Sequence, residues 1–93
     1  MSLSIEKSDV FQKEYSSWNM KLEKIQNESI KKELTGLLNS LVKTVRLLDT
    51  CHNDLGTANR ISANALEFRQ SIYELRTNIH KKFQEVEAVE GPL

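Results

Sequence analysis

The chain has 93 residues, a length that fits one small domain. It carries 13 Lys and Arg against 13 Asp and Glu, so its formal net charge is zero and long-range attraction to nucleic acid or to an anionic membrane has no global source. The single cysteine, Cys51, cannot form an internal disulfide, and no apolar run reaches the roughly 18 residues of a membrane-spanning helix. We therefore expect one domain over residues 1–93, in a reducing, cytoplasmic compartment and without membrane insertion.

The first expected helix covers residues 8–26. Its apolar residues recur at intervals of four and three, which predicts a helix with a narrow apolar seam. They are Phe11, Tyr15, Trp18, Leu22 and Ile25. Ser4, Ser8 and Asp9 are candidate N-caps. The spacing breaks over residues 26–29, where Asn27 and Ser29 can each cap a following helix. We expect a turn there, and one long bent helix is the alternative.

The second expected helix, residues 29–53, has the broadest apolar face in the chain. On a helix its apolar residues occupy a sector of about 140°. They are Leu34, Leu37, Leu38, Leu41, Val42, Val45 and Leu48. A sector this wide needs cover from more than one neighbouring helix.

The third expected helix covers residues 57–89, after a turn-rich segment over residues 51–57. Its apolar residues follow a nearly regular heptad pattern. They are Ile61, Ala65, Phe68, Ile72, Leu75, Ile79, Phe83 and Val86, with Val89 as an extension. Gly91 and Pro92 end the helix.

Two narrow seams beside one broad face predict an all-α fold, an antiparallel three-helix bundle. The alternative is a long helical hairpin that oligomerises through a coiled-coil-like core. In the bundle we expect the C-terminal end of the third helix to extend beyond the other two helices. Phe83, Val86 and Val89 would then be poorly covered. An uncovered apolar seam is a candidate association surface. The predicted partner-binding residues are Leu75, Ile79, Phe83 and Val86.

No residue pattern indicates a catalytic, cofactor or metal site, so we expect no enzyme activity and no cofactor. Cys51 and His52 are adjacent but lack the further ligands that a metal site needs. Four apolar residues lie off the seams and would form a second contact surface if they gathered on one side. They are Met20, Leu47, Leu66 and Tyr73.

The segment 11–24, FQKEYSSWNMKLEK, resembles the opening helix of spectrin-type repeats, in which a tryptophan follows an aromatic or aliphatic residue by about two turns. Those repeats are three-helix bundles that act as spacers and docking surfaces. Regulatory three-helix domains of membrane-fusion proteins are equally similar. The resemblance is one of architecture, and we assign no family from it.

The sequence therefore favours a non-enzymatic helical interaction module, or a small coiled-coil-like adaptor or scaffold subunit of a larger assembly. It would contact protein partners, or further copies of itself, through helix–helix packing. The alternative is a small helical nucleic-acid-binding protein, although the charge balance leads us to expect no nucleic acid. That alternative would use five cations, Lys43, Arg46, Arg76, Lys81 and Lys82.

Overall fold

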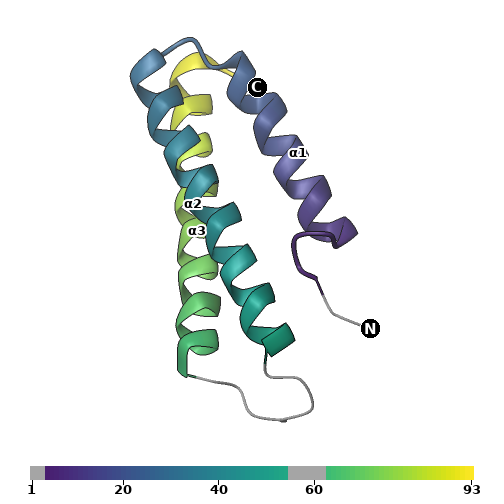
Figure 1. The fold of residues 1–93 in the computed structure, drawn as a ribbon. Helices are drawn as coiled ribbons and strands as arrows, with labels where there is room; N and C mark the ends of the chain where they lie inside the picture. Colours follow the sequence, from purple (N-terminus) through teal and green to yellow (C-terminus); the bar gives the residue numbers. More distant parts are fainter. Residues whose placement is uncertain (1–3, 55–62) are drawn as a thin grey trace.

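The protein folds as an all-α three-helix bundle, as the sequence predicted (Figure 1). The computed structural model describes residues 4–54 and 63–93, and within these ranges the side chains other than those of residues 52–54 and 63–64. The helices are α1 (Asp9–Lys24), α2 (Glu28–Asp54) and α3 (Ala63–Glu90). α1 and α2 are separate helices, so the long-hairpin alternative is not the structure of this chain. The predicted start of the third helix, at residues 57–62, lies outside the described residues.

Local hydrogen bonds account for where the first two helices begin. The Ser8 hydroxyl accepts a hydrogen bond from the N–H of Phe11 at 3.2 Å, so Ser8 is the N-cap of α1. The side-chain oxygen of Asn27 accepts from the N–H groups of Ser29 and Ile30, at 3.0 and 3.2 Å. Asn27 therefore satisfies two N–H groups that have no partner within the first turn of α2.

The turn between α1 and α2 forms without glycine or proline. Ile25 ends α1 in an extended conformation, with φ −72° and ψ 129°, and its side chain is 3% exposed. The carboxylate of Glu90, the last residue of α3, accepts hydrogen bonds from the N–H groups of Gln26 and Asn27 at 2.9 and 3.4 Å. The buried side chain of Ile25 and the carboxylate of Glu90, which is more than 60 residues away in sequence, thus stabilise the turn.

The broad face of α2 forms the centre of the core. Leu34, Leu41 and Val45 are fully buried, whereas Leu37 and Val42, at the two edges of the sector, are half-buried. α1 and α3 contribute the seams that the sequence predicted. Their buried apolar residues are Phe11, Trp18, Leu22, Ala65, Ile79, Phe83 and Val86. No helix in the described part of the chain is long and apolar enough to cross a membrane.

The uncovered end of α3 is its N-terminal end, opposite to our expectation. α1 has 16 residues against 28 in α3, and the short turn to α2 places α1 beside the C-terminal half of α3. The ion pairs Glu14–Arg76 and Lys21–Glu87 connect the two helices there. Phe83 and Val86 are each only 2% exposed as a result, so the prediction that they lack cover was wrong, although Val89 is 87% exposed. α2 and α3 instead extend beyond the start of α1 (Figure 1).

Candidate partner-binding groove

The predicted partner-binding residues lie mainly inside the bundle. Ile79, Phe83 and Val86 are 0, 2 and 2% exposed and belong to the main apolar core, and Leu75 is half-buried against it. Partner contact through these side chains stays a prediction. It would require the helices to separate, because three of the four side chains are buried in the closed bundle.

A groove of about 550 Å³ runs along α2 on the side that faces α1. Tyr15 contributes from α1, and the other lining residues belong to one stretch of α2. They are Asn39, Val42, Lys43, Arg46, Leu47 and Thr50. No acidic side chain is among these lining residues.

Part of the groove lining is hydrophobic and consists of Tyr15, Val42 and Leu47. Val42 lies at the edge of the apolar sector of α2, packs against the core and is half-buried. The ring of Tyr15 stacks on the buried ring of Phe11, with centroids 5.7 Å apart and an angle of 12° between the planes. Leu47 is 43% exposed. The groove therefore combines apolar surface with an aromatic ring that stacks on the core, which is typical of protein contact sites.

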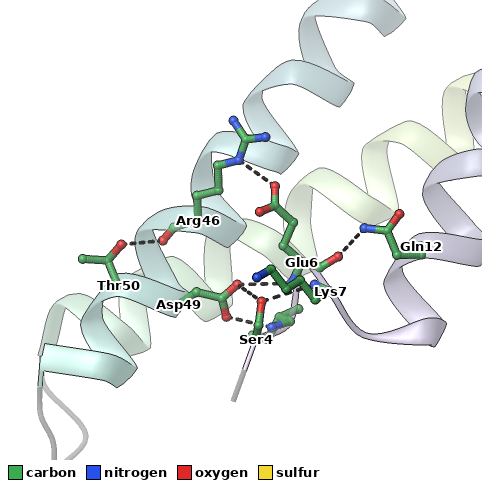
Figure 2. Close-up of polar contacts among 8 residues, drawn as sticks. Ser4, Glu6, Lys7, Gln12, Arg46, Asp49 and Thr50 are labelled. Atoms are coloured by element: carbon green, nitrogen blue, oxygen red, sulfur yellow. Dashed lines mark hydrogen bonds and ion pairs between the residues drawn. The ribbon is translucent and has the colours of Figure 1, made fainter. Parts of the chain in front are cut away.

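The segment before α1 is hydrogen-bonded to α2 close to this groove. Asp49 is 8% exposed, and its carboxylate accepts hydrogen bonds from the N–H of Ile5 at 2.8 Å, the N–H of Glu6 at 3.1 Å and the hydroxyl of Ser4 at 3.3 Å (Figure 2). We call residues 4–8 the N-terminal arm. Hydrogen bonds to a charged acceptor are stronger than neutral ones, so Asp49 holds the arm firmly.

The arm also reaches a residue that lines the groove. Glu6 accepts a hydrogen bond from Nε of Arg46 at 2.6 Å, and Figure 2 shows this pair beside Asp49. The side-chain amide of Gln12 in α1 donates to the backbone oxygen of Glu6. Sequence reasoning missed the roles of Asp49 and Glu6, because their partners are about 40 residues away and no local pattern marks them.

Two further hollows lie beside the contact between α1 and α3. Glu14 and Arg76 form a two-bonded ion pair, with distances of 2.7 and 2.8 Å, and both residues line a hollow with Trp18 and Tyr73. The same pair borders a smaller hollow beside Ile72. The hydrogen bond with Glu14 raises the pKa of the Arg76 guanidinium.

The four off-seam apolar residues do not share one hollow. Leu47 lines the groove between α1 and α2, Tyr73 lines the hollow between α1 and α3, and Met20 lines a third hollow beside Leu93. Leu66, on the uncovered part of α3, is 54% exposed. Only Leu47 therefore adds to the groove.

The five cations of the nucleic-acid alternative are divided among different parts of the molecule. Arg46, Arg76 and Lys82 each form an ion pair, with Glu6, Glu14 and Glu33 respectively. Lys43 lies in the groove beside α1, whereas Arg76 lies on the α3 side. The arrangement concentrates two cations, Lys43 and Arg46, at the groove.

Cys51 is a free, half-buried thiol, and the side chain of His52 lies outside those that the structure describes. Among the described residues, no group of three or more His, Cys, Asp or Glu side chains is placed to hold a metal ion. Comparison of the chain with protein-family models, curated proteins and solved structures finds no match.

Proposed function

We propose that this chain is a non-enzymatic interaction module, a subunit or adaptor of a larger assembly, and that it binds a helix of a partner protein in the groove between α1 and α2. The observation that carries the proposal is the groove itself, in which Tyr15, Val42 and Leu47 present apolar surface that the bundle does not cover. Apolar surface beside polar rim residues is the usual composition of a protein contact site. A cytoplasmic setting agrees with the single free cysteine.

The shape of the groove favours a helical ligand. Its α2 side extends from Asn39 to Thr50, which at 1.5 Å per residue is about 17 Å, or three turns of a partner helix. An amphipathic helix binds in such a groove through apolar side chains at positions i, i+3 or i+4, and i+7 of its own sequence. The bundle stays closed in this mode, because none of the fully buried residues has to move.

The experiment is a selection of binders followed by mapping of their site. A displayed library of about 18-residue amphipathic helical peptides is selected against the full chain, and enriched peptides are titrated into ¹⁵N-labelled protein. We expect amide shifts concentrated at Asn39, Val42, Lys43 and Leu47. Shifts confined to α3, or a library that yields no binder, would contradict the proposed function.

Two variants test the site at exposed side chains outside the core. Leu47→Ser removes apolar surface from the groove and should weaken an enriched peptide by about tenfold, about 1.4 kcal/mol. The control is Leu66→Ser, which removes an exposed apolar side chain away from the groove and should leave binding unchanged. Equal losses in the two variants would contradict a site at the groove.

A further inference from the structure

The groove is a local concentration of positive charge on a chain whose net charge is zero. Lys43 and Arg46 line it, and the other lining residues are uncharged. Along α2 these are the only charged residues between Glu33 and Asp49. Charge complementarity therefore favours an acidic ligand over a basic one.

One of the two cations already has a carboxylate partner from this chain. Glu6 is 2.6 Å from Nε of Arg46, yet the Arg46 side chain remains 67% exposed. The Glu6 side chain is 27% exposed, and an ion pair in contact with solvent adds little to stability, so its loss costs the protein little. The backbone of the arm is held separately by Asp49, so Glu6 could leave Arg46 while the arm stays attached.

We propose that the partner helix carries carboxylates on its polar flank, and that one of them replaces Glu6 on Arg46 while another pairs with Lys43. This inference rests on the proposed function, because it names the chemistry of the ligand of that groove. The two cations are three residues apart on α2, so they lie on neighbouring turns of one helix face. Carboxylates three or four residues apart on the partner helix match that spacing, while its apolar residues contact Val42 and Leu47. Glu6 is then an internal competitor of the partner.

The composition of selected peptides tests the charge claim. The library has fixed leucines on the apolar face and Glu, Gln or Lys with equal frequency at the flanking positions. We expect Glu to be enriched at positions three or four apart. Peptides that shift the groove amides but show no preference for Glu would overturn this inference and leave the proposed function standing. The absence of any binder at the groove would overturn both.

Charge variants of the full chain test the two cations and the competitor, with an enriched Glu-containing peptide as the probe. Lys43→Glu should weaken binding about tenfold, whereas the matched control Lys81→Glu, an exposed reversal on α3, should change it less than twofold. Glu6→Gln should strengthen binding by about two- to fivefold, because Arg46 is then free. Equal losses in the two reversals, or weaker binding in Glu6→Gln with a helical content like that of the parent chain, would overturn the inference.

Two further measurements test for other ligands of the groove. A second copy of the chain would give a molar mass by light scattering that rises with concentration and falls back in Lys43→Glu. A nucleic acid would bind as a fluorescent 20-base oligonucleotide at low ionic strength, with an affinity that drops steeply with salt and in Lys43→Glu. Either result would overturn an acidic helix as the occupant.

Discussion

The carboxylate of Asp49, near the end of α2, accepts a hydrogen bond from the backbone N–H of Ile5 at 2.8 Å, across 44 residues of sequence. The neighbouring N–H of Glu6 donates to the other oxygen of the same carboxylate at 3.1 Å. One side chain on α2 therefore determines where the N-terminal arm lies. With the arm in that position, the Glu6 carboxylate accepts a hydrogen bond from Arg46 at the groove.

Asp49→Ala should release the arm and lower the free energy of unfolding by about 1–3 kcal/mol, because buried hydrogen bonds to a charged acceptor are lost. Urea denaturation measures the change, and faster amide exchange at Ile5 and Glu6 locates it. The control is Glu23→Ala, an exposed acid in α1, for which we expect a change within about 0.5 kcal/mol. Undiminished protection of both amides in Asp49→Ala would show that something else holds the arm.

Leu41→Ala should cost about 2–5 kcal/mol, since Leu41 is fully buried at the centre of the α2 face and its truncation leaves a cavity. Leu47→Ala makes the same chemical change on the same helix at a side chain that is 43% exposed, and should cost less than about 1 kcal/mol. Thermal and urea unfolding compare the two. Similar losses at both positions would contradict the orientation of α2 in the bundle.

Gly36→Ala should stabilise the protein by about 0.5–1 kcal/mol, because Gly36 is an exposed residue inside α2 and an added Cβ meets no atom within 4 Å. Gly91→Ala should instead destabilise it by about 1 kcal/mol, since Gly91 ends α3 with φ +91°. The difference in melting temperature between the two variants is the observable. A loss of stability in Gly36→Ala would mean that α2 is interrupted at that residue.

Glu14 and Arg76 should show a coupling free energy of about 0.3–1 kcal/mol in a double-mutant cycle with Glu14→Gln and Arg76→Gln. The geometry is favourable, with two hydrogen bonds, but the Arg76 side chain is 46% exposed and solvent screens the pair. The coupling should decrease between 0.05 and 1 M NaCl. A coupling that is unaffected by salt would indicate a buried, unscreened contact, contrary to this structure.

The helices and their buried faces were predictable because both depend on short-range periodicity. Leu34, Leu38 and Leu41 repeat on one side of α2, and all three are buried. Ser8 and Asn27 also cap helices as residue type and position suggested. These features depend on residues within about a turn of one another.

The cover of α3 and the groove were not predictable by the same means. Which half of α3 is covered depends on the short α1 and on its position beside the start of α2, and this buries Phe83 and Val86. The groove depends on contacts between residues about 40 apart, such as Arg46 with Glu6. The sequence named Lys43 and Arg46 only among five candidate cations, and its spacing could not place Tyr15 beside them.

The most direct measurement of the central claim is a set of intermolecular NOEs between the isotope-labelled full chain and an unlabelled, enriched helical peptide. The account predicts NOEs from the peptide leucines to the methyl groups of Val42 and Leu47 and to the ring of Tyr15, with the core methyl groups of Leu41 and Ile79 silent. NOEs to Leu41 or Ile79 would mean that the bundle opens to bind its partner. That result, or NOEs only to Leu66 and Tyr73 on α3, would contradict a binding site in the groove between α1 and α2.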